Sequence, residues 1–252
     1  MTTFLIIAFS ILFILYIAGT YNKIKNKSDT ESKKRIEKLT QENNTNNINF
    51  KTNKNATPYC LIFDVETTGL IKDFSIRPSI KSIRENPDNF PEIVSICWAL
   101  FSRNEEIITE KNYIIKKEHI PIESVRIHNI TKEISQNKGI EIQKALEELF
   151  IDAEKCKAIV GHNIIFDKHV IEAEFIRIGM KKPFTNKTNY DTMKMGQTFM
   201  QTNKFPKLSE LCEFIYGKEI LQHLNSHNSM YDTFFTAKSF FFLKNKKGYY
   251  WN

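Results

Sequence analysis

Short apolar runs and longer amphipathic segments alternate along most of the chain. The runs at residues 59–65 (YCLIFDV), 92–101 (EIVSICWALF) and 107–116 (IITEKNYIIK) have the length and the large side chains of strands. An amphipathic helix is predicted around residues 140–155, and a further strand follows at 157–163 (KAIVGHN). This order of elements predicts an α/β protein with a mixed sheet covered by helices.

Three further helices are predicted in the second half of the chain. Helical spacing runs through residues 166–179, and the glycine and proline at its end are typical helix terminators. Two more helices are predicted at 207–216 and 229–243.

Two segments show no regular spacing. Residues 71–91 contain three prolines, so they are predicted to form a long surface excursion between the first two strands. Residues 120–131 (IPIESVRIHNIT) are predicted to form a loop that contains a proline.

The first 21 residues are apolar and carry no charged side chain. About 20 residues of helix span about 30 Å, which is the thickness of the hydrocarbon core of a bilayer. We therefore predict a transmembrane anchor at residues 1–21. Three lysines follow directly, and the positive-inside rule then places the rest of the chain in the cytoplasm. A cleaved secretory signal is the alternative, although a basic start and a small-residue cleavage site are not clear.

Residues 22–56 are rich in Asn, Lys and Thr and hold few large apolar side chains. Such a segment has too little apolar surface to offset the entropy of ordering, so a flexible polar linker is predicted. Residues 57–252 then form the folded domain. Residues 21–56 hold nine basic and four acidic side chains, which leaves only +2 of the net charge of +7 for the domain. Nucleic-acid binding therefore has to be argued from a site and not from the total charge.

The cysteines are widely scattered, without a zinc-ligand spacing. They are Cys60, Cys97, Cys156 and Cys212. We expect reduced, buried thiols and a reducing compartment.

Acidic residues provide the candidate chemistry. Asp64 and Glu66 lie two residues apart at the end of the first predicted strand, so the pleat directs both carboxylates to one face. Asp167 follows a predicted strand at the start of a helix, and Asp232 lies in the last predicted helix. Each acid alone is more typical of a solvated position. If all four converge, they could hold two Mg²⁺ or Mn²⁺ ions for phosphodiester hydrolysis.

His227 is a candidate proton acceptor because it stands five residues before Asp232, at the lead-in to the last predicted helix. The ordinary pKa of histidine lies near neutrality, which suits proton transfer from an attacking water. A helix cap or a solvated loop residue is the alternative interpretation of His227.

Three ordered motifs resemble those of a known family. They are DVETTGL at 64–70, GHNIIFD at 161–167 and HNSMYD at 227–232. They are similar to the three exonuclease motifs of the DEDDh superfamily, which includes the proofreading subunit of bacterial replicative polymerase. IHNIT at 127–131, YDTM at 190–193 and KLSELCEFIYG at 207–217 resemble intervening signatures, and the resemblance extends over about residues 59–242.

The resemblance implies a ribonuclease-H-like fold with a mixed five-stranded sheet flanked by helices. By motif position it implies that Asp64, Glu66, Asp167 and Asp232 are metal ligands and that His227 is the general base. It also places Thr67, Thr68, His128 and Asn163 near the terminal nucleotide. Asn129 stands where the family pattern has glycine, and the segment 71–91 is longer than the loop in many relatives.

The resulting hypothesis is a membrane-anchored 3′–5′ exonuclease that releases nucleoside 5′-monophosphates from single-stranded or frayed 3′ ends. DNA is favoured over RNA, with an exoribonuclease as the alternative. Phe166 is predicted to stack on a terminal base, although a core position would also explain it. A second class of function is a nucleic-acid-binding module of the same fold without activity, and a third is local action at a membrane complex.

Overall fold

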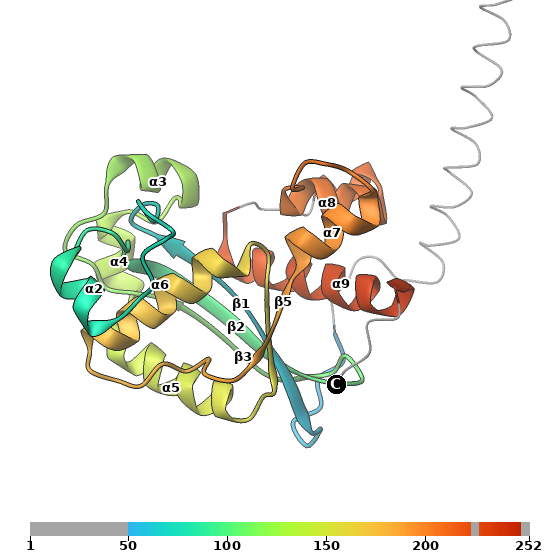
Figure 1. Ribbon diagram of the computed structural model, residues 1–252, viewed down its shortest axis with the longest axis horizontal. Helices are drawn as coiled ribbons and strands as arrows, with labels where there is room; N and C mark the ends of the chain where they lie inside the picture. Colours follow the sequence, from blue (N-terminus) through green and yellow to red (C-terminus); the bar gives the residue numbers. More distant parts are fainter. Residues whose placement is uncertain (1–49, 223–226, 248–252) are drawn as a thin grey trace, which may run out of the picture. The chain divides into compact units, whose positions relative to one another are not determined.

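Five strands form one mixed sheet in the order β3-β2-β1-β4-β5 (Figure 1). The computed structural model describes residues 50–222 and 227–247. The strands are β1 (Pro58–Thr67), β2 (Ile93–Ser102), β3 (Ile107–Ile114), β4 (Ala158–Gly161) and β5 (Thr188–Asp191). β1 pairs antiparallel with β2 and parallel with β4. The mixed five-stranded sheet is therefore confirmed.

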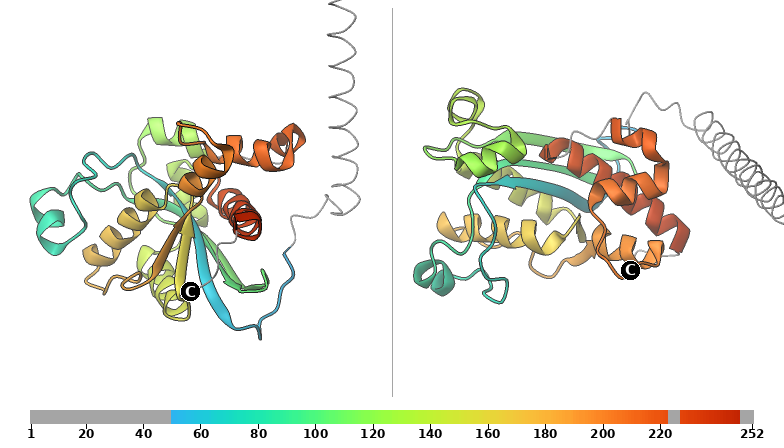
Figure 2. Two further views of the ribbon diagram at one scale, coloured as in Figure 1. Left: turned by 45° about the vertical axis from the view of Figure 1, so that its right-hand side comes forward. Right: turned by 90° about the horizontal axis from the view of Figure 1, so that it is seen from above.

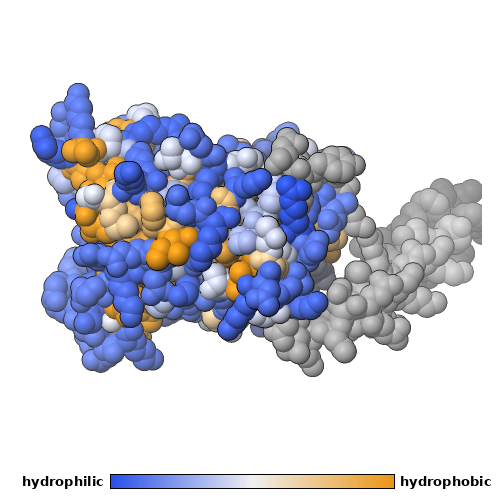
Figure 3. Space-filling model, turned by 90° about the horizontal axis from the view of Figure 1, so that it is seen from below, coloured by the Kyte–Doolittle hydropathy of each residue, from blue (hydrophilic) through white to orange (hydrophobic). Residues whose placement is uncertain are grey.

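Helices cover both faces of the sheet (Figures 1 and 2). They are α2 (Ile80–Glu85), α3 (Ile122–His128), α4 (Lys132–Lys138), α5 (Ile142–Glu154), α6 (Ile164–Arg177), α7 (Thr192–Met200), α8 (Leu208–Tyr216), the 3₁₀ helix η1 (Lys218–Gln222) and α9 (Ser229–Lys247). One hydrophobic cluster lies between the sheet and α5 with α6, and a second lies between the sheet and α7 to α9. Figure 3 shows that the face seen from below is mostly hydrophilic, with separate hydrophobic patches.

The alternation of side chains along β1 serves both clusters. Phe63 and Val65 point into the cluster with α6, whereas Cys60 and Ile62 point into the cluster with α9. Phe63 is fully buried and stacks on Phe184, with ring centroids 5.0 Å apart. Burial of each such side chain stabilises the fold by about 1.5–3 kcal/mol. Because strand side chains alternate, the residues two and four positions after Ile62 share its face.

The segment 71–91 connects β1 and β2, and most of its side chains are exposed, as expected of the predicted surface excursion, but it also contains regular structure. It contains the short helix α2, which begins with a reciprocal pair of hydrogen bonds between Ser79 and Ser82. Ile71 and Phe90 at its two ends are buried. The helix α2 and the two buried ends were not predicted, because the three prolines interrupt any regular spacing of apolar residues.

Several short elements were not predicted from the sequence. α3 and α4 occupy the region predicted as a loop and the residues after it, and β5 and α7 were missed. β5 is a four-residue edge strand (TNYD) without an apolar run, so its pattern gives no strand signal. Asn129 ends α3 with a left-handed backbone (φ 60°), a conformation that asparagine tolerates well. The turn is therefore formed without the family's glycine.

The predicted anchor at residues 1–21 lies outside the described residues, as does most of the predicted linker. From Phe50 the chain contacts the sheet, where Ile107 donates a backbone hydrogen bond to Lys51 and accepts one from Asn53. Phe50 also packs edge-on against Phe101, with ring centroids 4.8 Å apart. Among the helices that the structure describes, none is long and apolar enough to cross a membrane.

Candidate active site

The carboxyl end of β1 carries the first two acids. Asp64 lies opposite Cys97 and Glu66 opposite Ser95 on the neighbouring strand β2. Both follow Ile62 at even spacing, so they occupy the face that α9 covers. The side chain of Glu66 is largely buried at 8% exposure. The arrangement predicted for this pair, with both carboxylates on one face, follows from the strand.

Asp167 reaches the same end of β1 from the first turn of α6. Its Oδ1 accepts a hydrogen bond from the backbone N–H of Val65 at 3.1 Å. The Val65 side chain points to the opposite face, and its N–H ties the helix to the strand between Asp64 and Glu66. An acid in the first turn is also favoured by the positive end of the helix dipole.

Asp232 comes from the first turn of α9, and its Oδ2 accepts a hydrogen bond from the backbone N–H of His227 at 3.1 Å. His227 has a left-handed backbone (φ 64°), which turns the chain into the helix. The start of α9 is fixed on β2 by a 2.8 Å hydrogen bond between the hydroxyls of Ser95 and Ser229. The loop and the helix together therefore place His227 beside the acid.

The four carboxylates share one environment, which raises the pKa of each. Burial raises the pKa of Asp64 well above its usual range, and the charges of Asp167, Asp232 and Glu66 raise it further. Burial and the charges of Asp232 and Asp167 raise the pKa of Glu66 to about 8. Burial likewise raises the pKa of Asp167 to about 8 and that of Asp232 to about 6, although backbone N–H groups oppose both shifts. Like charges gathered in a poorly hydrated place account for this pattern.

These residues fit a divalent cation. Within the described ranges, no lysine or arginine forms an ion pair with any of the four acids. One ligand atom each from Glu66, His227 and Asp232 lies within 4.8 Å of the others. Asp64 and Asp167 are not part of this closest group. They lie near enough to it for the charges of Asp167, Asp232 and Glu66 to raise the pKa of Asp64. Oxygen donors of this type suit Mg²⁺ or Mn²⁺.

The residues predicted to contact substrate differ in accessibility. Thr67 and His128 are buried, at 9% and 6% exposure, whereas Asn163 is exposed at the start of α6. Burial lowers the pKa of His128; the Thr67 backbone opposes this shift and the charge of His227 adds to it. The ring of His128 accepts the N–H of Ile130 at Nδ1, so its Nε2 carries the hydrogen.

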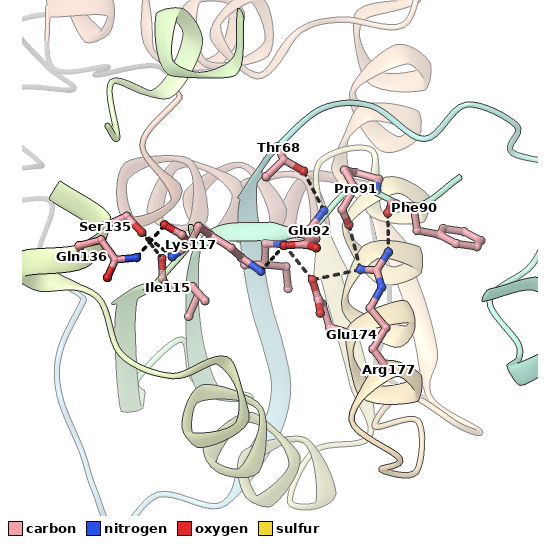
Figure 4. Close-up of polar contacts among 11 residues, drawn as sticks. Thr68, Phe90, Pro91, Glu92, Ile115, Lys117, Ser135, Gln136, Glu174 and Arg177 are labelled. Atoms are coloured by element: carbon pink, nitrogen blue, oxygen red, sulfur yellow. Dashed lines mark hydrogen bonds and ion pairs between the residues drawn. The ribbon is translucent and has the colours of Figure 1, made fainter. Parts of the chain in front are cut away.

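Thr68 belongs to a polar network that holds the turn after β1 (Figure 4). Its N–H donates to the carbonyl oxygen of Glu92, and its Oγ1 accepts the N–H of Glu92 at 3.0 Å. The carboxylate of Glu92 pairs with Lys117 at 2.8 Å. On the other side, Arg177 donates to the carbonyl oxygens of Phe90 and Pro91.

Glu174 closes this network from α6. Its buried carboxylate accepts the N–H of Ile93 at 3.1 Å and pairs with Arg177 at 3.1 Å. The first residues of β2 are thereby joined to α6. This link could not be predicted from the sequence, because Glu174 lies in a helix with an ordinary polar spacing.

Asp191 is a further acid near the site that the acidic pattern alone did not indicate. It ends β5, and its Oδ1 accepts N–H groups from Asn163 and Met193, both at 3.0 Å. Its charge contributes to the raised pKa of Asp167. Its only signal in the sequence was the resemblance of YDTM to a family signature.

The family model RNase_T, described as Exonuclease, matches residues 61–240. The chain belongs to this exonuclease family. The family falls within the DEDD superfamily, so the resemblance to DnaQ-like exonucleases is confirmed at the superfamily level. A comparison with curated proteins gave no match.

Solved structures share the fold of this exonuclease domain. Escherichia coli exonuclease I in complex with a dT13 oligonucleotide has a TM-score of 0.58 at 17% identity, over 75% of this chain and 42% of that one. The zinc-bound form of the E. coli exonuclease I complex with single-stranded DNA has a TM-score of 0.58 at 17% identity, over 77% and 41%. Exonuclease X in complex with 5′ overhanging duplex DNA has a TM-score of 0.50 at 19% identity, over 77% and 94%. The chain thus spans less than half of exonuclease I, and the ribonuclease-H-like fold is confirmed.

Proposed function

We propose that this chain is a metal-dependent 3′–5′ exonuclease of the DEDDh type that releases nucleoside 5′-monophosphates, with DNA favoured over RNA. The observation that carries the proposal is the gathering of four acids from β1, α6 and α9 beside His227. Their raised pKa values reflect burial and mutual repulsion, and a bound cation would relieve the repulsion. Membership of an exonuclease family supports the same chemistry.

Asp64, Glu66, Asp167 and Asp232 would hold the cations. Two Mg²⁺ or Mn²⁺ ions in such a site would lower the pKa of the attacking water and stabilise the departing oxygen. The protein's own contribution is positional. The hydrogen bond from Val65 keeps Asp167 at the end of β1, and the one from the backbone of His227 keeps Asp232 in place.

His227 would accept the proton of the attacking water. A general base must lie within hydrogen-bond reach of the proton that it removes, and the His227 ring lies beside two of the acids. Its side chain is exposed, so it faces the side from which water and substrate arrive. The close grouping also favours a second role, in which His227 is itself a ligand, and metal affinity distinguishes the two roles.

The terminal nucleotide would lie along the turn after β1, near Thr67, Thr68 and His128. The Nε2–H of His128 is a hydrogen-bond donor next to the Thr67 backbone. A cavity of about 340 Å³ between α6, β5 and α7 is lined by Lys168, Lys194 and other residues. These lysines would bind phosphates of the strand, so activity should fall steeply as salt increases. DNA bound to exonuclease I and to exonuclease X in solved structures supports a DNA strand as substrate.

The test uses the full chain and a single strand labelled at its 5′ end. With Mg²⁺, we expect stepwise shortening from the 3′ end and release of mononucleotides. EDTA should abolish this cleavage, and His227→Ala should slow it strongly. A circular single strand should remain intact. Cutting of the circle would identify an endonuclease, and binding without any cleavage would identify an inactive module. The same strand made of RNA measures the preference for DNA.

The membrane anchor at residues 1–21 stays a prediction from the sequence. We propose that it tethers the exonuclease domain on the cytoplasmic side. Cell fractionation of the full chain and of a version that lacks residues 1–21 tests this proposal, since only the full chain should sediment with membranes and resist extraction by salt.

A further inference from the structure

The segment 71–91 is fastened to the outer side of α6. The guanidinium of Arg77 donates to Nε2 of the buried His169 at 2.9 Å. Lys182 donates to the carbonyl oxygen of Pro78 at 2.5 Å and pairs with the buried Glu172 at 3.2 Å. The hydrogen bonds of Arg77 and of Pro78 connect residues 92 and 104 positions apart in the chain. The segment therefore has a defined position beside α6, the helix that carries Asp167.

Within this segment, Asp73 near its start and Asn89 near its end are joined by two hydrogen bonds. The N–H of Asp73 donates to Oδ1 of Asn89 at 2.8 Å, and Nδ2 of Asn89 donates back to the carbonyl oxygen of Asp73 at 3.1 Å. Asn89 is buried at 5% exposure, which protects both bonds from water. Phe74 follows Asp73 directly, so these two hydrogen bonds also hold the backbone of Phe74 in place.

Phe74 lies against Phe166, the neighbour of Asp167. The two ring centroids are 6.5 Å apart, with the rings tilted by 45°. Phe166 is partly buried and contacts the hydrophobic cluster beneath α6, whereas Phe74 remains 46% exposed. A phenylalanine at such an exposed position contributes little to the stability of the fold, because much of its apolar surface stays in water. The exposed part of Phe74 is therefore available to a ligand next to Phe166, the residue that precedes Asp167 in the first turn of α6.

We propose that Phe74 stacks on a nucleobase near the 3′ end of the substrate and, with Phe166, determines how firmly the end of the strand is held. The inference rests on the proposed function, because the strand must reach Asp167 for its last bases to reach Phe74. Aromatic rings bind bases of any sequence through their π-faces. The contact of Phe74 with Phe166, the neighbour of Asp167, favours a base over an apolar partner protein, whose binding would not depend on the presence of bases.

The test combines variants with substrates that lack single bases. Phe74→Ala is compared with wild type on single strands that carry an abasic residue at the first, second or third position from the 3′ end. Ile80→Ala is the matched control, since Ile80 is 71% exposed on α2 of the same segment. We expect Phe74→Ala to raise KM about tenfold on the intact strand, with a smaller change in kcat. At one abasic position the wild type should lose the same factor, and Phe74→Ala should add no further loss.

A second measurement separates this inference from the proposed function. Binding of a 5′-fluorescent strand is measured in the His227→Ala background, where cleavage is strongly slowed. If the chain does not cleave but Phe74→Ala weakens binding only when the base is present, the exonuclease proposal fails and the stacking inference stands. If cleavage occurs and Phe74→Ala behaves like Ile80→Ala on every strand, the inference is overturned alone. Absence of both cleavage and strand binding contradicts both.

Discussion

The backbone N–H of Val65 donates a hydrogen bond to Oδ1 of Asp167 at 3.1 Å, across 102 positions of the chain. This bond joins the strand that carries Asp64 and Glu66 to the helix that carries the third acid. The geometry follows from strand alternation, because the Val65 side chain is buried in the cluster with α6 while its neighbours face α9. One backbone group thus brings separate motifs into one site.

Removal of one buried carboxylate should stabilise the metal-free protein while it abolishes activity. Burial and neighbouring charges raise the pKa of Glu66 to about 8, so its ionised form is unfavourable in the folded state. We expect Glu66→Gln to raise the melting temperature in EDTA at pH 8.5 by several degrees. Differential scanning calorimetry measures this change. Glu110→Gln on β3 is the control, and an equal or lower melting temperature for Glu66→Gln would contradict the account.

The stability of the metal-free protein should fall as pH rises. Because the pKa values of Glu66 and Asp167 are raised to about 8 in the folded state, from ordinary values near 4, the folded chain binds more protons over this interval. Their contribution is therefore complete below about pH 4 and is lost as pH rises through about 8. Melting curves in EDTA between about pH 5.5 and 8.5 should show this decline. Added Mn²⁺ should restore stability most strongly at the alkaline end, and a flat or rising curve in EDTA opposes this explanation.

Substitution of His227 should reduce turnover without loss of cations if it is the base. We expect His227→Ala to lower kcat by about 10²- to 10⁴-fold. Calorimetric titration with Mn²⁺ should give an affinity within a few-fold of wild type. Asp232→Asn provides the comparison, since loss of a ligand should weaken Mn²⁺ binding clearly. An affinity reduced equally by both substitutions would make His227 a ligand instead.

The link from α6 to the start of β2 should be important for stability. Glu174→Ala removes the acceptor for the N–H of Ile93 and the partner of Arg177. We expect a loss of about 2–4 kcal/mol in the free energy of unfolding, because a buried N–H loses its acceptor and a partly buried guanidinium loses its carboxylate partner. Urea unfolding measures the loss. Glu85→Ala, which removes an exposed ion pair with Lys81, should change stability by less than about 0.5 kcal/mol.

The sequence predicted the central parts of this fold because their side-chain spacing reports burial directly. β1, β2 and α6 are long, and each has apolar residues on the faces that become buried. β5 and α3 are short and lie at the margins, where tertiary contacts determine structure more than local pattern. Within the segment 71–91, α2 and the contacts that position the segment were not predicted, since a contact such as that of Arg77 with His169 joins residues far apart in the chain.

The candidate site was predictable in composition but not in arrangement. The spacing of Asp64 and Glu66 places both carboxylates on one face by strand geometry alone. The approach of Asp167 depends on a backbone hydrogen bond, and that of His227 on a left-handed residue conformation, so neither appears in any local spacing. The role of Glu174 and the position of Phe74 beside Phe166 could not be predicted either. The first arises only when α6 meets the start of β2, and the second only when α6 meets the segment 71–91.

The most direct test of the central claim is anomalous diffraction from crystals of the protein soaked in Mn²⁺ at about pH 8. The account predicts two manganese peaks at the end of β1, held by oxygens of Asp64, Glu66, Asp167 and Asp232, with the His227 ring beside them and not bound to either ion. No peak at this position, or a single ion bound by Glu66, His227 and Asp232 alone, would contradict it.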